Sequence, residues 1–225
     1  MGFLFNARPS DSPLVETVWQ TQSQGGGSFI STAASQWEMV VTKQKGKITF
    51  SIRGPETKAS PAPIPEDAEF FGIIFKQGAF MPRLPKKDLL DGGIHLPQDA
   101  SDSFWLDGAL WQFPDFENAD TFVNRLVRAN LLAQDQVVTD LLRGHTQYLS
   151  LRSIQRRFLH VTGLTYKSIQ QIERARHALN LLRSGIPIPE TAYQAGYFDQ
   201  PHLTKSLKFF VGQTPTEIVK SNHSE

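Results

Sequence analysis

The chain has 225 residues, a net charge of +1, and 40% hydrophobic and 20% charged residues, which suits one large or two modest globular domains. It contains no cysteine, which excludes disulfides, thiolate metal sites and cysteine nucleophiles. The first residues, MGFLFNARPS, lack a basic start and a long apolar run, and no segment approaches the roughly 18 apolar residues of a membrane span. We therefore expect a cytoplasmic protein with no membrane partner.

The first part of the chain has the patterns of β-strands. The segments WEMVVTK and KITFSIR each alternate apolar and polar residues, and the short QKG between them predicts a hairpin. FFGIIF is a short continuous apolar run, typical of a buried strand. Four prolines between residues 55 and 65 predict a loop, because proline cannot donate to a ladder, and QGGGS predicts a flexible connection. These patterns suit a β-rich domain of barrel or cupin-like fold.

From about Pro85 the pattern becomes helical. PKKDLLDGG predicts a short helix that ends at glycine, and SDSFWLDGALW has a helix-like spacing of apolar residues. NADTFVNRLVRANLL and AQDQVVTDLLRG continue the helical pattern. The predicted class is α+β, with a β-rich domain with a few helices at 1–128 and an all-α domain at 129–225.

Charge is divided unevenly between the two parts. Residues 1–142 contain 12 Lys and Arg and 17 Asp and Glu, a net charge of −5, whereas residues 143–225 contain 11 and 5, a net charge of +6. This asymmetry favours a basic module that meets a polyanion. A chance distribution of surface charge would account for it as well.

The segment LSLRSIQRRFLHVTG predicts a helix with Ser150 as its N-cap and Gly163 at its end. Its apolar residues share one face, and Arg152, Gln155 and Arg156 fall on others. Arginine and glutamine have the donors that recognise guanine and adenine edges in a major groove. The commoner role of such residues is a solvated cationic face.

A long helix over 167–184 follows, and then two short helices with a turn between them. Gly196 follows the first short helix, and Asp199 is placed to cap the second, QPHLTKSLKFFVG. In that second helix, His202 and Lys205 lie off the apolar face, near the helix start. TPTEIV then has the form of a capping box. The arrangement predicts a helix-turn-helix, although a corner of an ordinary α-bundle has the same pattern.

The C-terminal part resembles the DNA-binding domain of the AraC/XylS transcription regulators from about residue 134 to 220. That domain has two helix-turn-helix units joined by a long linker helix. The second unit matches the family motif at Ala192, Gly196, Tyr197, Asp199, Gln200, His202, Leu203, Thr204, Lys205, Leu207, Lys208, Phe210, Gly212, Thr214 and Pro215. The first unit matches it at Ser150, Arg152, Ile154, Gln155, Arg156, Phe158, Thr162 and Gly163.

The resemblance implies a sequence-specific DNA-binding transcription regulator that is not an enzyme and needs no cofactor. Helices near 151–162 and 200–211 would then enter major grooves, and Arg152, Gln155, Arg156, Pro201, His202 and Lys205 would face the bases. Pro201 has no side-chain donor, so it could offer only apolar contact.

The first unit departs from the family pattern. Where a full scaffold helix is usual, this sequence has RGHTQYL with Gly144, and glycine costs about 1 kcal/mol against alanine inside a helix. Either QDQVVTDLLRG serves as the scaffold after a longer turn, or the first unit is degenerate.

The role of the N-terminal domain is less defined by its residues. In the AraC/XylS family such a domain commonly senses a ligand or dimerises, so double-stranded DNA, RNA polymerase, a small-molecule effector and a second copy of the chain are the partners considered. Residues 1–142 contain a single histidine, His95, which argues against a catalytic metal. Trp37, Trp105 and Trp111 could line an apolar pocket, but core packing is the commoner role. The alternative function is a ligand-binding or enzymatic β-domain with a helical interaction tail.

Overall fold

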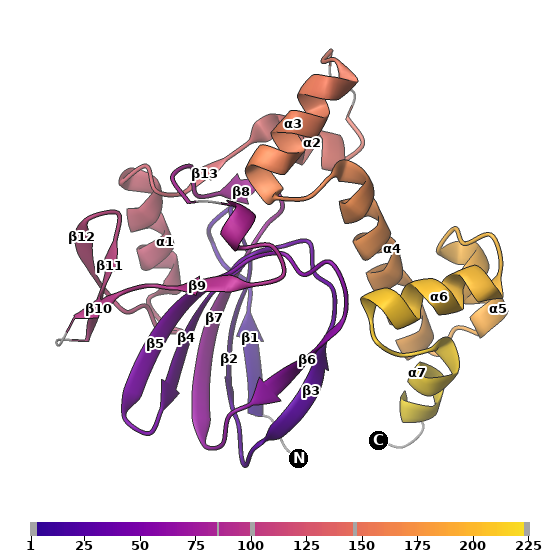
Figure 1. Cartoon of the computed structure of the whole chain (residues 1–225), viewed down its shortest axis with the longest axis horizontal. Helices are drawn as coiled ribbons and strands as arrows, with labels where there is room; N and C mark the ends of the chain where they lie inside the picture. Colours follow the sequence, from indigo (N-terminus) through magenta and orange to yellow (C-terminus); the bar gives the residue numbers. More distant parts are fainter. Residues whose placement is uncertain (1–3, 85, 100–101, 146–147, 223–225) are drawn as a thin grey trace. The chain divides into compact units, whose positions relative to one another are not determined.

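The computed structural model describes residues 4–84, 86–99, 102–145 and 148–222 (Figure 1). The chain forms two compact units, of which the first consists of residues 1–27, 36–55 and 63–163 and the second of residues 28–35, 56–62 and 164–225. The expected class, a β-rich region followed by a helical region, is confirmed.

Strands occupy the first part of the chain, together with one 3-10 turn. They are β1 (Leu4–Arg8), β2 (Val15–Gln22), β3 (Gly27–Ser31), β4 (Glu38–Gln44), β5 (Lys47–Arg53), β6 (Ser60–Ile64), β7 (Ala68–Phe75), β8 (Ala79–Phe80), η1 (Lys86–Asp88), β9 (Gly93–His95), β10 (Gln98–Asp99), β11 (Ser103–Leu106), β12 (Ala109–Gln112) and β13 (Ala133–Gln134). The helices are α1 (Ala119–Arg128), α2 (Gln136–Leu142), α3 (Leu151–Thr162), α4 (Tyr166–Arg183), α5 (Ile188–Gln194), α6 (Gln200–Phe210) and α7 (Pro215–Asn222).

A six-stranded antiparallel sheet is the main element of the first unit. Its strand order is β1-β2-β7-β4-β5-β9, so β1 and β9 form its edges. The predicted hairpin is confirmed as β4 and β5, with Lys45 and Gly46 at positive φ in the turn between them. The predicted buried strand is β7, which lies in the middle of the sheet between β2 and β4.

One face of this sheet packs against β11 and α1 to form the core of the first unit. Phe50 of β5 lies with its ring centroid 4.5 Å from that of Phe104 on β11 and 6.2 Å from that of Phe122 on α1. All three rings are buried. Since each large aromatic side chain buries about 150–250 Å², this cluster contributes much of the apolar burial that holds the sheet to α1.

The prediction of a helix over SDSFWLDGALW is wrong. Its described residues from Ser103 onward form β11 and β12, an antiparallel hairpin in which Leu106 pairs with Ala109. Asp107 and Gly108 occupy the turn with φ of 52° and 75°. Positive φ at both central residues is the requirement of a type I′ turn, for which Asp-Gly is a preferred pair.

The prediction of a loop throughout the proline-rich segment is also wrong. Residues Ser60–Ile64 form β6, whose single partner among the described strands is β3, in a two-stranded sheet. Pro61 and Pro63 are two residues apart, so their backbone nitrogens point to the same edge of the strand. A strand with a single partner leaves one side free of ladder bonds, which is where prolines are tolerated. QGGGS is likewise only partly a connection, because β3 begins at Gly27.

The short helix predicted at PKKDLLDGG is reduced to the single turn η1. Three residues cannot offset the cost of nucleating an α-helix, so the segment forms a 3-10 turn between β8 and β9. Leu89, just after the turn, is buried in the core of the first unit.

The second unit has its own core, formed by α4 to α7. Buried side chains on α4 include Ala175, Leu179 and Leu182, and they pack in one cluster with Leu203 and Leu207 of α6. The predicted caps of the last two helices are confirmed. The Asp199 carboxylate accepts a hydrogen bond from the amide of His202, and Thr214 and Glu217 form the reciprocal bonds of a capping box.

Two segments of the N-terminal sequence also belong to the second unit. The amides of Ala33 and Ala59 donate to the carbonyl oxygens of Phe210 and Phe209, at 2.7 and 2.9 Å. These carbonyls lie in the last turn of α6, where intrahelical donors are lacking. The two segments therefore complete the hydrogen bonding of the α6 C-terminus. The domain boundary at 128/129 does not coincide with this grouping of contacts, and it stays a prediction.

Candidate nucleic-acid interface

The second helix-turn-helix is formed by α5 and α6. Helix α5 ends at its C-cap Ala195, and Gly196 follows with φ of 69°. A side chain is strained at this φ, so glycine allows the chain to turn sharply before Asp199 caps α6. The predicted turn, cap and second helix are thus all present in the predicted order.

His202 and Lys205 lie on the exposed side of α6, opposite its buried residues. Counted from the N-cap Asp199, Pro201 is the second residue of the helix, His202 the third and Lys205 the sixth. All three are exposed, whereas Leu203 and Leu207 are fully buried. Burial of one face fixes the rotation of the helix and thereby aims the other face at solvent.

These residues border a broad, shallow hollow of about 1210 Å³ that includes part of the linker helix α4. Arg174, His202, Lys205 and Lys208 contribute to its lining, and no carboxylate does. Lys208 also lies 3.6 Å from Glu217 at the side-chain termini. The surface around the start of α6 is therefore cationic, as contact with a polyanion requires.

Tyr197 is buried beneath this surface and contacts residues of both α4 and α6. Its hydroxyl lies 2.8 Å from the Ser206 Oγ, and its ring meets the His202 ring edge-on with centroids 5.1 Å apart. The Arg174 guanidinium lies over the same tyrosine ring at 5.3 Å, and it donates to the Gly196 carbonyl at 3.4 Å. Burial raises the pKa of Tyr197, although the Ser206 hydrogen bond and the Arg174 charge act in the opposite direction.

Helix α3 carries the first set of predicted base-reading residues. Ser150 caps it by accepting from the Ser153 amide, and Gly163 ends it with φ of 76°. Arg152, Gln155 and Arg156 are exposed, while Phe158 and Val161 are buried. Arg156 borders a hollow of about 470 Å³ with Ser153, Arg157, Leu159 and His160, again without a carboxylate.

Helix α2 packs against α3 and supplies the scaffold. The Asp135 carboxylate caps α2 at the Val138 amide and accepts from the Arg157 Nε at 2.6 Å. Gly144 follows the α2 C-cap with φ of 82°, so it lies outside the helix and carries no helix-interior penalty. The segment QDQVVTDLLRG therefore contains the helix that precedes α3, and a longer connection follows it. Residues 146 and 147 of this connection lie outside the described residues.

The other end of α3 packs within the first unit. The His160 ring lies edge-on to Phe80, with centroids 5.9 Å apart. The Lys86 ammonium lies 5.5 Å from the same phenylalanine ring and donates to the Leu84 carbonyl at 3.1 Å. Burial lowers the pKa of Lys86 to about 8.

The two exposed helix faces correspond to each other position by position. Arg152 and Pro201 are the second residues of their helices, and Arg156 and Lys205 are the sixth. By this correspondence Thr204 of α6 matches Gln155 of α3. Thr204, Gln200, Arg174 and Gln171 line the α6 hollow but were missed in the sequence. Aligning the sequences of α3 and α6 from their N-caps would have identified Thr204. The sequence around Gln171 and Arg174 of α4 gives no indication that they lie beside α6.

A comparison with protein families agrees with this geometry. A model described as a helix-turn-helix domain matches residues 147–221. This part of the chain is an AraC-type helix-turn-helix domain. Such domains belong to DNA-binding transcription regulators, so the expected resemblance is confirmed for the helical region.

Solved structures of ToxT from Vibrio cholerae are similar to the chain at low identity. One is 10% identical, covers 98% of both chains and has a TM-score of 0.45, and another, from V. cholerae O395, is 11% identical, covers 96% of this chain and 97% of that one and has a TM-score of 0.43. A third, described as ToxT bound to an unsaturated fatty acid, is 12% identical, covers 96% and 94% and has a TM-score of 0.37. With these low values the likeness supports no conclusion about this chain. No curated protein matches it.

Two further features concern only the described residues. None of their helices has both the length and the apolar character needed to cross a membrane. They also hold no group of three or more histidine, aspartate or glutamate side chains arranged to bind a metal ion.

Proposed function

We propose that this protein is a sequence-specific transcription regulator that reads double-stranded DNA with α3 and α6. The observation that carries the proposal is the surface at the start of α6. There, within an AraC-type domain, exposed His202 and Lys205 border a hollow with cationic side chains and no carboxylate in its lining.

In this proposal the exposed residues divide into two kinds. Arg152, Gln155 and Arg156 on α3, and His202 and Lys205 on α6, contact base edges in the major groove, and Pro201 adds an apolar contact. Arg174 and Lys208 lie further from the helix start and contact phosphates, which position the protein without reading sequence. No catalytic, cofactor or metal role is proposed for any residue.

The expected setting is the nucleoid in the cytoplasm of a bacterial cell. RNA polymerase and a second copy of the chain are the protein partners that such a regulator would meet. A small-molecule effector would act through the β-rich unit.

The test begins with DNA fragments of the source genome, titrated with the whole protein and followed by gel shift. A specific site bound at about 10⁻⁸ M or tighter, and far above random DNA, supports the proposal. The variant His202→Ala should then lose about 1–3 kcal/mol on that site while binding random DNA nearly unchanged.

A matched control is His177→Ala, because His177 is an exposed histidine on α4 that does not line the hollow. Its affinity for both kinds of DNA should equal that of the wild type. Equal losses of His202→Ala on specific and random DNA would rule out base reading by His202. Absence of any preferred genomic site would rule out sequence-specific regulation.

A further inference from the structure

The core-facing side of the six-stranded sheet changes from apolar to polar side chains along the strands. In the row formed by Val18, Ile73 and Met39 on β2, β7 and β4, every side chain is fully buried. Residues two positions along a strand point to the same face. The following row on this face is Asn6, Gln20, Phe71 and Val41, and the row after it includes Gln22, Glu69 and Lys43. Along this face, fully buried aliphatic residues thus give way to half-buried Gln20 and then to exposed polar and charged side chains.

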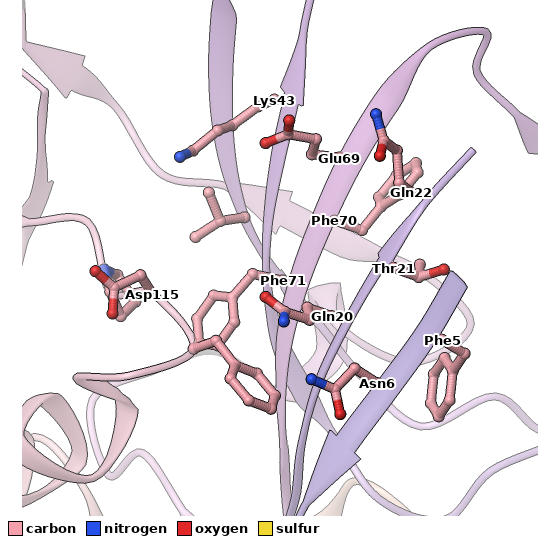
Figure 2. Close-up of a pocket in the computed structure, with 13 residues that line it drawn as sticks. Phe5, Asn6, Gln20, Thr21, Gln22, Lys43, Glu69, Phe70, Phe71 and Asp115 are labelled. Carbon is pink, nitrogen blue, oxygen red and sulfur yellow. The ribbon is translucent and has the colours of Figure 1, made fainter. Parts of the chain in front are cut away.

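A cavity of about 370 Å³ lies over these two rows. Figure 2 shows Asn6, Gln20 and Phe71 on neighbouring strands, with Asp115 on the segment that faces them. Pro114, Asp115 and Phe116 form this segment, which connects β12 to α1. The volume falls at the small end of the roughly 300–1,000 Å³ typical of ligand sites.

The wall opposite the sheet is fixed by several interactions. The Arg8 guanidinium donates twice to the Phe116 carbonyl, at 3.2 and 2.7 Å, and lies 5.2 Å from the centroid of the Phe116 ring. The Asp115 carboxylate accepts from the amides of Glu117 and Asn118. The site is therefore formed before any ligand arrives, which reduces the entropy cost of binding.

The amide groups on the floor are available to a ligand. Within the described residues, the side chains of Asn6, Gln20 and Gln22 make no hydrogen bond. Each amide offers both donors and an acceptor. The exposed amides of Asn6 and Gln22 and the half-buried amide of Gln20 can therefore exchange water for the polar edge of a ligand.

The positions of the polar and apolar side chains around the cavity favour one chemical class of ligand. Amides lie along one side, and Val41, Phe71, Pro114 and Phe116 provide apolar contacts around them. A planar heterocycle has this same division, with a hydrogen-bonding edge and two apolar faces that stack on aromatic rings. A polyol has hydroxyl groups around its whole ring, and a long-chain acid needs a longer apolar channel. The lining contains Lys43 together with the carboxylates of Asp115 and of its cross-strand partner Glu69, so it offers no cluster of cations for a phosphate.

We propose that this cavity binds a small uncharged heterocycle of one or two rings with an amide-like edge, of the purine or pyrimidine type. Asn6 and Gln20 bind its edge, and Phe71 and Phe116 contact its faces. The binding does not depend on DNA reading, so it can be tested whether or not the proposed function holds.

The test uses the whole protein and isothermal titration calorimetry with adenine, guanine, hypoxanthine, cytosine and uracil as probes. At least one base should bind with one-to-one stoichiometry, and Gln20→Leu should weaken it at least tenfold. Gln112→Leu is the matched control, because Gln112 is exposed on β12 outside the cavity, and it should bind as the wild type does. A hexose, indole and a C16 fatty acid are the comparison ligands.

Hydrogen exchange of the wild type keeps the test decisive if a variant fails to fold. The bound base should slow exchange at the amides of residues 20–22, 69–71, 115 and 116. The proposal is overturned if no base binds at millimolar concentration, if a comparison ligand binds in preference to all five, or if protection falls outside these segments.

Discussion

At the residue scale, Tyr197 connects three parts of the second helix-turn-helix. It lies in the turn after Gly196, contacts His202 at the start of α6 and is covered by Arg174 from α4. An exposed histidine has several rotamers, and base reading needs one of them. The edge-on ring contact favours one orientation of His202, so Tyr197 is a positioning residue in the proposed function.

We therefore predict different effects for two substitutions of Tyr197. Tyr197→Phe removes the bond to Ser206 but keeps the ring, so specific DNA affinity should remain within about threefold of the wild type. Tyr197→Leu removes the ring contact, worth about 0.5–1.5 kcal/mol, and should reduce specific affinity by a comparable amount. The ratio of specific to random DNA binding separates this effect from a general loss of folding. Equal ratios for the two variants would refute the positioning role.

We expect the stability of the first unit to depend on pH through the carboxyl group of Asp120. It accepts hydrogen bonds from Ser10 and from Arg8, the latter at 2.8 Å, and so ties the N-terminal segment to α1. Burial acts to raise the pKa of Asp120, but the hydrogen bonds of Ser10 and Arg8 outweigh it and lower the pKa below its ordinary value of 3.8. A lowered pKa means that the ionised form stabilises the fold above about pH 4 and that this contribution is lost as the pH falls through the folded pKa.

The corresponding prediction concerns Asp120→Asn. At pH 7 this variant should lower the free energy of unfolding by about 1–3 kcal/mol, because Arg8 loses a charged acceptor. Near pH 3 the difference from the wild type should shrink, because the carboxyl group of the unfolded chain binds protons there and the ionised form no longer contributes its full stabilisation. Urea titrations at both pH values measure it, and a difference that grows on acidification would contradict the assignment.

At the element scale, the helices were predictable and part of the β-structure was not. The caps Ser150, Asp199 and Thr214 act locally, so their sequence positions define helix starts without tertiary information. The β11–β12 hairpin was missed because its apolar spacing was given more weight than the Asp107-Gly108 pair, which is the stronger short-range signal. Strand β6 was missed because its prolines are tolerated only through its single partner, which lies distant in sequence.

The candidate site shows the same division between local and distant information. The exposure of His202 and Lys205 follows from the helical period, and the sequence predicts it. The presence of Arg174 in the α6 hollow requires the packing of α4 on α6, for which the local pattern gives no sign. The cavity over Gln20 was likewise not predicted, because it depends on the register of β1, β2, β7 and β4.

The linker α4 has 18 residues, which corresponds to a rod of about 27 Å. If α3 and α6 both enter DNA, they should occupy successive major grooves about 34 Å apart, and the linker must fix their rotation. One residue inserted after Asn180 would rotate everything beyond it by about 100° and displace buried Leu182. An insertion variant that stays folded should lose most specific affinity, and its DNase footprint should shrink to one groove. A wild-type footprint of one groove, unchanged by the insertion, would mean that α3 is not used.

At the scale of the whole molecule, the sequence boundary and the packing differ. Helices α2 and α3 group with the β-rich residues, whereas segments 28–35 and 56–62 group with α4 to α7. In the second unit, Ser31 donates to Glu56 at 2.6 Å, and Ala34 pairs with Glu56 as an isolated bridge. The second unit is therefore built from both halves of the sequence, which bears on how a truncated chain should behave.

The last prediction concerns a fragment from Ala129 to Glu225, which contains both α3 and α6. Its excess of basic residues should let it bind DNA with an affinity that falls steeply as salt rises, because each phosphate contact releases a counterion. It lacks Ala33 and Ala59, so the carbonyls of Phe209 and Phe210 lose their donors. Each lost hydrogen bond costs about 0.5–1.5 kcal/mol, so α6 should be less stable in the fragment than in the whole protein.

Two measurements on this fragment check the two parts of the prediction. Hydrogen exchange should be faster at residues 208–212 in the fragment than in the whole protein, while the slope of log affinity against log salt should be similar in both. A folded fragment with no salt-dependent DNA binding would exclude α3 and α6 as the DNA-binding surface. Equal exchange rates at 208–212 would show that the N-terminal segments do not stabilise the end of α6.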